Sequence, residues 1–344
     1  MKFDFAIGNP AYNADFSNSG ENGNFAAPIY NKFLDEAVKV ADKVEMIHPA
    51  RFLFNAGSTP KEWNEKMLNN PHFKILSYEA DSSKIFTNTD IKGGVAISYS
   101  DSTKNYGVIG TFTPFPELNG IVKKSRIDNQ NDNLSSIIYT QVRFDLDELY
   151  KEYPEYKALI GSNGKDKRFR NNAFEKISVF SEMPTANDDI KVIGVLKNKR
   201  TWRYIPSRFV DKTHENLKCW KVLCPRANGA GIFGEVLSPL VIGEPNIGYT
   251  QTFIGIGAFK TRFEAEAAEK YIKSKFTRSL LDVLKVTQDN DRGVWKLIPL
   301  QDFTSNSDIN WNTSIKNIDK QLYKKYGLTQ EEIDFIETHV KEME

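Results

Sequence analysis

The fold is decided by the stretch Phe3-Asp4-Phe5-Ala6-Ile7-Gly8-Asn9-Pro10-Ala11-Tyr12 at the start of the chain. Residues 2–8 form a short, mostly apolar run that stops at glycine, asparagine and proline, which is typical of a buried strand ending in a turn. In an open α/β sheet, ligands bind just beyond the carboxyl ends of the strands. We therefore expect residues 9–12 to lie at a binding edge.

The following residues alternate between helical and strand patterns. A helical pattern covers residues 28–42, and a second begins at Thr59, which we expect to cap a helix with Pro60 in its first turn and Glu62 three residues on. Strand patterns cover residues 44–48, 73–78 and 94–99. This alternation predicts an α/β domain with a doubly wound, parallel sheet in residues 1–110.

The pattern changes near residue 110 to short strands and to loops rich in Asn, Gly, Ser and Pro. A helical pattern returns at residues 262–284. Another lies at the end of the chain, where Thr329 and Glu332 have the spacing of a capping box. We therefore expect residues 111–344 to form a second domain of mixed α+β structure.

Composition indicates an ordinary globular protein. The chain has 344 residues, of which 40% are hydrophobic and 26% charged, so it can bury a full core. The start does not resemble a signal peptide, and no apolar run approaches the roughly 20 residues that span a bilayer. We expect a cytoplasmic protein with no membrane partner. Its two cysteines, Cys219 and Cys224, lack the partners of a zinc site, so we expect reduced thiols and no metal.

Asn9, Pro10 and Tyr12 carry groups that can hold an adenine. The amino group of adenine is a poor nucleophile because its lone pair is delocalised into the ring. Hydrogen-bond acceptors activate this amino group. The side-chain oxygen of Asn9 and the backbone oxygen of Pro10 can accept from it and stabilise the positive charge that develops on its nitrogen as it attacks a sulfonium methyl group. Tyr12 can stack on a base that has been rotated out of the duplex.

The motif Asn9-Pro10-Ala11-Tyr12 resembles the Asn-Pro-Pro-Tyr signature of amino-group DNA methyltransferases from restriction-modification systems. Ala11 departs from that signature but leaves both acceptors and the aromatic ring intact. The resemblance implies a site-specific adenine methyltransferase that uses S-adenosyl-L-methionine and double-stranded DNA, with Asn9, Pro10 and Tyr12 as its catalytic residues.

Other stretches extend the resemblance. Residues 90–99 are similar to the late strand whose aromatic residue packs against the flipped base. The resemblance gives this role to Tyr99, and the alternative is that Tyr99 is only a core residue. Residues 294–303 and 318–328 look like the specificity region of bifunctional type II methylases. The resemblance thus makes residues 1–110 the C-terminal half of a methyltransferase catalytic domain and residues 111–344 a target-recognition domain.

A basic segment lies in the second domain. Residues 190–226 hold ten lysines and arginines against two acids, with four interleaved aromatic rings. This is the pattern of a phosphate-binding surface, although it also fits a solvated strand surface above core aromatics. The predicted DNA-binding residues are Tyr99 and, in this segment, Lys197, Lys199, Arg200, Arg203 and Arg208.

The cofactor-binding residues are not identified by the sequence. Related methyltransferases hold the cofactor with a glycine-rich loop and an acidic residue before the Asn-Pro motif, and only eight residues precede Asn9 here. Two glycine-rich stretches, residues 228–234 and 253–259, lack the strand and helix context of such a loop. Three explanations stay open: a separate polypeptide carries the loop, the sequence is a fragment, or the methylase has decayed. Each leaves an apolar edge and face of the first strand uncovered.

Two other functions remain possible. One is a DNA-binding specificity module or methylase remnant without turnover, which would keep only the basic segment. The other is a nuclease with Asp188, Asp189 and Lys191 at a metal centre, although a solvated turn explains these residues more simply.

Overall fold

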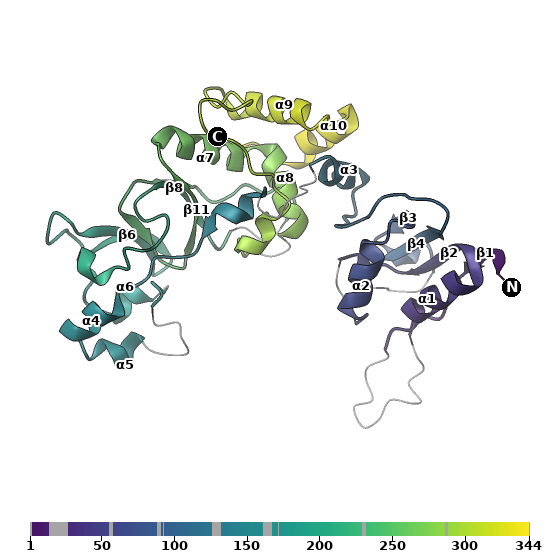
Figure 1. The fold of residues 1–344 in the computed structure, drawn as a ribbon, viewed down its shortest axis with the longest axis horizontal. Coiled ribbons are helices and arrows are strands. Elements are labelled where there is room, and N and C mark those ends of the chain that lie inside the picture. The colour runs from purple at the N-terminus through teal and green to yellow at the C-terminus, as the bar shows by residue number, and fades with distance from the viewer. Residues whose placement is uncertain are drawn as a thin grey trace. The chain divides into compact units, whose positions relative to one another are not determined.

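The chain folds into two compact units, residues 1–119 and 120–344. The computed structural model describes residues 2–13, 27–54, 58–87, 91, 93–125, 132–160, 167–170, 172–228, 232–285 and 288–343. Figure 1 shows the elements of both units. The assignment of residues 1–110 to catalysis and of residues 111–344 to target recognition stays a prediction.

Unit 1 is built on a four-stranded sheet with two α-helices (Figure 1). The predicted strands and helices are all present. The elements are β1 (Phe3–Gly8), α1 (Tyr30–Val40), β2 (Ala41–Pro49), η2 (Arg51–Phe54), α2 (Lys61–Leu68), β3 (Phe73–Glu79), η3 (Ser82–Lys84) and β4 (Val95–Asp101).

The predicted all-parallel sheet is wrong, because the sheet is mixed. Its strand order is β1-β2-β4-β3, with β1 parallel to β2 and with β4 antiparallel to both β2 and β3. Only β1 and β2 are joined by a helical crossover, through α1. No α-helix separates β3 from β4 within the described residues, so the chain turns back and β4 pairs antiparallel between β2 and β3.

One face of this sheet forms the core of unit 1. The core cluster joins Val44 and Met46 of β2 and Ala96 of β4 to Tyr30 of α1 and Trp63 of α2. Ala6 of β1 packs against the same cluster. Each helix thus packs its hydrophobic face against the sheet, and β1 contributes Ala6 to the buried side.

The other face of β1 is exposed, so the prediction of a buried strand is wrong for alternate residues. Side chains alternate between the two faces of a strand, and Phe3, Phe5 and Ile7 are 61%, 42% and 77% exposed. Strand β1 also lies at an edge of its sheet, with β2 as its one neighbour in the described part of the chain. Among the described residues, the edge and this apolar face of β1 are thus uncovered.

Two predicted helix boundaries need correction. The residue that precedes α2 is Pro60, and the buried Thr59 hydroxyl donates to the side chain of Asn64 at 2.7 Å rather than capping the helix. The helix predicted at residues 262–284 is two helices, because Ser274 leaves the helical conformation and its hydroxyl accepts from the backbone N–H of Thr277. The capping box of Thr329 and Glu332 is confirmed.

Unit 2 contains two separate sheets, β10-β6-β7 and β5-β11-β8-β9, together with most of the helices. The strands are β5 (Ile138–Tyr139), β6 (Ile190–Leu196), β7 (Lys199–Ile205), β8 (Trp220–Pro225), β9 (Val241–Gly243), β10 (Ile247–Tyr249) and β11 (Phe253–Phe259). The helices are α4 (Leu146–Glu152), α5 (Tyr156–Ile160), α6 (Ala173–Lys176), α7 (Arg262–Lys273), α8 (Lys275–Leu284), α9 (Ile315–Lys325) and α10 (Gln330–His339), with α3 (Pro116–Lys124) across the division and η4 (Leu134–Ile137), η5 (Ser207–Phe209) and η6 (Arg292–Trp295) as short turns.

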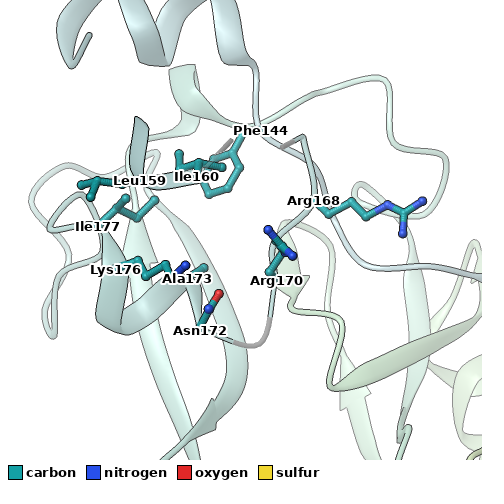
Figure 2. A pocket seen from close by; sticks show the side chains of 9 residues that line it. All are labelled: Phe144, Leu159, Ile160, Arg168, Arg170, Asn172, Ala173, Lys176 and Ile177. Atoms are coloured by element: carbon teal, nitrogen blue, oxygen red, sulfur yellow. The ribbon is translucent and has the colours of Figure 1, made fainter. Parts of the chain in front are cut away.

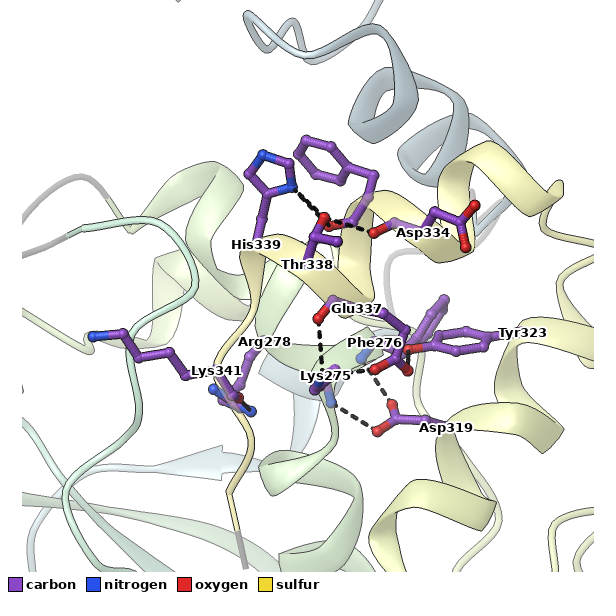
Figure 3. Close-up of polar contacts among 11 residues, drawn as sticks. Lys275, Phe276, Arg278, Asp319, Tyr323, Asp334, Glu337, Thr338, His339 and Lys341 are labelled. Atoms are coloured by element: carbon purple, nitrogen blue, oxygen red, sulfur yellow. Dashed lines mark hydrogen bonds and ion pairs between the residues drawn. The ribbon is translucent and has the colours of Figure 1, made fainter.

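A buried carboxylate fixes the start of α8. Asp319 of α9 accepts hydrogen bonds from the backbone N–H groups of Lys275 at 3.1 Å and Phe276 at 2.9 Å (Figure 3). Burial raises the pKa of Asp319 to about 6. The side chain therefore satisfies N–H groups that a helix start leaves without intrahelical partners, and it ties α9 to α8.

His48 is a buried titratable group in unit 1. Its Nδ1 donates to the carbonyl of Pro49 at 3.1 Å, which leaves Nε2 to accept from the hydroxyl of Ser98 at 2.7 Å. The ring stacks on Tyr30 with centroids 5.6 Å apart. Burial lowers the pKa of His48 to about 4, so the imidazole is neutral and links β2 to β4.

We predict that acid weakens unit 1 through His48. The unfolded chain binds the imidazole proton below a pKa near 6.5 and the folded chain only near 4, so stability is lost as the pH falls between these values. The loss reaches about 3 kcal/mol at pH 4. Urea titrations at pH 4 and 7, followed by the methyl NMR signals of Met46 and Met67, measure it. His48→Gln should remove this part of the pH dependence and His72→Gln should keep it. Equal pH dependence of His48→Gln and the parent would contradict the assignment.

Candidate functional site at the carboxyl end of strand β1

The Asn-Pro motif lies where the sequence predicted it, directly after β1. Gly8 is the last residue of the strand and pairs with Met46 of β2. Asn9 and Ala11 are exposed, and Pro10 is partly exposed. The side-chain oxygen of Asn9 and the carbonyl of Pro10 therefore stand at the carboxyl edge of the parallel pair β1 and β2, which is the edge where open α/β sheets bind ligands.

Tyr12 is fixed to the residues that precede α1. Its carbonyl accepts from the backbone N–H of Ile29 at 3.0 Å, and Asn13 forms a bridge with Pro28. The Tyr12 hydroxyl is buried and has no hydrogen-bond partner among the described residues. Burial also raises the pKa of this phenol. A buried hydroxyl without a partner costs about 1–3 kcal/mol, so its surroundings are not optimised for this arrangement.

The aromatic ring that faces Tyr12 belongs to Phe86, which the sequence analysis missed. The two ring centroids are 6.4 Å apart with the planes at 65°. Phe86 follows η3 in the connection between β3 and β4. A single aromatic residue among Ser, Thr and Asn residues was the available signal, and it lies outside every periodic pattern.

Tyr99 lies in a different environment from the one predicted. It is in β4 opposite Glu45, its ring centroid is 6.1 Å from Phe5 and 6.2 Å from Tyr106, and the Lys74 ammonium is 5.4 Å from it. Because Phe5 is on the exposed face of β1, Tyr99 belongs to that face. Its role beside the flipped base stays a prediction, and these contacts do not support it.

Several residues of the basic segment are neutralised or buried. Lys221 is fully buried and donates to the carbonyls of Leu217, Glu244 and Ile247, so counting it as a surface charge was wrong. Arg203 pairs with Glu182 at 2.9 Å, and Arg208 forms a two-pronged contact with Glu152. These carboxylates reduce the attraction of both predicted DNA-binding residues for phosphate.

The interleaved rings support the basic side chains from below. The Lys191 ammonium lies 4.7 Å from the ring of Trp202, and the Arg208 guanidinium lies 4.4 Å from that of Phe209. Phe209 is fully buried. Trp202 and Phe209 therefore pack beneath the cations, as expected for aromatic residues under a solvated strand surface.

Lys197, Lys199 and Arg200 lie together at the tip of the β6–β7 hairpin. Positive φ angles of 49° at Lys197 and 62° at Asn198 give the tight turn that matches the twist of a two-residue hairpin. All three basic side chains are exposed, and none has an ion-pair partner in the part of the chain that the structure describes. The structure thus brings together three of the five basic residues predicted to bind DNA.

The glycine-rich stretch of residues 253–259 is a core strand. It is β11, paired antiparallel with β5 and β8. A Cβ atom at Gly255 would come within 2.3 Å of the Tyr249 hydroxyl and 2.6 Å of the Asn216 amide, so this glycine makes room for protein side chains. Of the other stretch, residues 229–231 lie outside the described residues.

The alternative sites named from the sequence gain no support. No group of three metal-ligating side chains occurs among the described residues. Asp189 instead accepts hydrogen bonds from Thr185 and Ala186, and Asp188 accepts one from Ser207, as in a surface turn. Cys219 and Cys224 are free thiols. No helix in the described part of the chain combines the length and hydrophobicity that a membrane span requires.

Comparison with known proteins agrees with the motif. Residues 1–86 match the family described as Eco57I restriction-modification methylase. An uncharacterized adenine-specific methylase of Mycoplasma pneumoniae is 34% identical over 96 residues, which are 28% of this chain and 22% of that relative. The chain therefore spans about a fifth of the length of this curated relative.

Solved structures give a weaker likeness. The type IIL restriction-modification enzyme MmeI in complex with DNA has 10% identity, covers 97% of this chain and 56% of its own, and gives a TM-score of 0.30. The type IIG restriction endonuclease BpuSI has 11% identity, 87% and 44% coverage, and a TM-score of 0.28. TM-scores this low carry no weight for the fold. The sequence matches do not depend on these structures: residues 1–86 match the model of the Eco57I restriction-modification methylases, and the chain is similar over 96 residues to an adenine-specific methylase.

Proposed function

We propose that this chain is part of a site-specific DNA adenine methyltransferase of a restriction-modification system, which transfers a methyl group from S-adenosyl-L-methionine to the amino group of a flipped adenine. The observation that carries the proposal is the position of Asn9 and Pro10, exposed at the carboxyl end of β1. The family match of residues 1–86 supports it. In this proposal unit 1 holds the base and unit 2 selects the DNA sequence.

Asn9 and Pro10 would act on the amino group of adenine. An amide oxygen and a backbone carbonyl accept its two hydrogens and leave the nitrogen lone pair directed at the methyl donor. Positive charge that develops on the nitrogen is then stabilised by two fixed dipoles. The proline keeps Asn9 out of the helical conformation, since a residue before proline favours extended backbone, and this holds the two acceptors side by side.

Tyr12 and Phe86 would form the walls that hold the flipped base. The two rings now meet edge to face at 6.4 Å, so a base enters only when they rotate apart. The unpartnered Tyr12 hydroxyl makes that movement easier, because no hydrogen bond to a described residue is broken. Stacking on an aromatic ring contributes about 1–3 kcal/mol per base.

The glycine-rich strand β11 does not fit the cofactor, because Gly255 is enclosed by the side chains of Tyr249 and Asn216 and cannot approach a ligand. In this proposal a separate polypeptide carries the cofactor-binding half, and it would also cover Phe3, Phe5 and Ile7. Burying such side chains stabilises an interface by roughly 1.5–3 kcal/mol each, and the free edge of β1 can accept a further strand.

The β6–β7 hairpin is the proposed DNA contact of unit 2. Lys197, Lys199 and Arg200 are exposed on a rigid turn. A two-stranded ribbon fits the major groove of B-DNA, and exposed cations attract the phosphates that flank it.

Asn9→Ala should lower the methylation rate of the complete assembly by about 100-fold or more, which is the scale of losing one preorganised polar group from a transition state. Turnover is measured as transfer of a labelled methyl group to duplex DNA. Asn13→Ala, an exposed amide four residues further along, is the matched control and should keep the parental rate. Equal rates for Asn9→Ala and the parent would reduce the motif to a turn.

Residues 1–344 alone should bind S-adenosyl-L-methionine only weakly, because the proposal assigns the cofactor loop to a separate polypeptide. Calorimetry should show no saturable binding in the micromolar range, while the same preparation binds duplex DNA. Micromolar cofactor binding would overturn the placement of the cofactor half outside this sequence. DNA binding without methylation by the assembly would instead indicate a specificity module.

A further inference from the structure

A small hollow lies on unit 2, and no residue of the β6–β7 hairpin is among those that line it (Figure 2). The space it leaves for water is only about 10 Å³, far below the roughly 300–1,000 Å³ of ordinary small-molecule sites. Phe144, Leu159 and Ile160 line one side of it and Lys176 of α6 the other. Arg170 faces these side chains, whereas Arg168 turns its guanidinium away from them. The hollow therefore combines an apolar wall with a cationic rim.

The rim is held rigidly by the core. The backbone N–H of Phe144 donates to the carbonyl of Lys167 at 2.6 Å, and that of Phe169 donates to Val142 at 3.0 Å. The N–H of Gln251 donates to the carbonyl of Phe169 at 2.8 Å. Phe169 is fully buried, with its ring centroid 4.3 Å from that of Phe144. The basic neighbours of Phe169 thus project from a backbone that cannot easily move.

The lining cations Arg168, Arg170 and Lys176, with the adjacent Lys167, differ from most arginines of the predicted basic segment. Arg203, Arg208 and Arg226 each contact a carboxylate. In contrast, Lys167, Arg168, Arg170 and Lys176 form no ion pair with any described residue. Unpaired cations on a fixed backbone keep their full attraction for an anionic ligand.

We propose that Lys167, Arg168, Arg170 and Lys176 bind the backbone of duplex DNA, with Leu159 and the adjoining apolar wall against the deoxyribose between two phosphates. An isolated inorganic anion would leave the apolar wall unused, whereas a DNA strand presents alternating phosphate and sugar. The inference rests on the proposed function, in which unit 2 binds DNA. It assigns part of the positioning contacts, which carry no sequence information, to a surface outside residues 190–226.

The test is the salt dependence of binding between the full chain and a fluorescein-labelled 30-base-pair duplex, measured by anisotropy. Each phosphate contact adds about 0.9 to the slope of log affinity against log salt concentration. The double variant Arg170→Gln with Lys176→Gln should lower this slope by about 2, equally on duplexes of unrelated sequence. Arg170→Lys preserves charge and should keep the parental slope.

The controls separate charge from shape. Arg262→Gln removes an arginine that Glu266 already neutralises, and its slope should remain near the parental value. Leu159→Ser should weaken binding by about threefold through lost apolar contact and leave the slope unchanged. An unchanged slope in the double variant, with the parent still binding, overturns this inference but not the proposed function. A parent that binds no duplex overturns both.

Discussion

The candidate site depends on the pairing of β1 with β2. Five residue pairs between Phe3 and Gly8 set the register, and side chains alternate between the faces of a strand. A slip of one residue would exchange the exposed and buried faces, turning Phe5 toward α1 and Ala6 outward. It would also move Asn9 relative to the edge. The position of the two acceptors is therefore a consequence of backbone pairing along a single strand edge.

The same strand makes unit 1 incomplete as a surface. Phe3, Phe5 and Ile7 are exposed together with the edge of β1, and natural proteins seldom leave such an edge unprotected. The helices α1 and α2 already pack against the opposite face of the sheet through Tyr30 and Trp63. The proposed cofactor-binding polypeptide would cover this edge and face, since it would complete the sheet beside the Asn-Pro motif.

Much of this arrangement could be predicted from local sequence patterns. The apolar run at residues 2–8 located β1, and the Asn-Pro motif located the site, because both signals are local. The direction of β4 could not be predicted, since it depends on a connection without an α-helix. Phe86 meets Tyr12 only through the fold, 74 positions further along the chain.

The basic segment shows the same limit for charge. Residue types revealed an excess of cations, but Glu152 neutralises Arg208 from 56 positions away and Lys221 is buried. Pairing of that kind is a property of the tertiary structure. Conversely, the sequence did not indicate the cations around Phe169 as a binding surface, because the backbone hydrogen bonds that hold them join segments far apart in the chain.

In the proposed function, the carboxyl end of β1 receives the adenine. Fluorescence of 2-aminopurine, placed at the methylated adenine of the recognised duplex, reports directly on a base that leaves the stack. The account predicts a rise in fluorescence when the complete assembly binds, altered by Tyr12→Ala and by Phe86→Ala but unaffected by Tyr99→Ala. No rise on binding, or a rise that responds to Tyr99→Ala and to neither of the other variants, would contradict it.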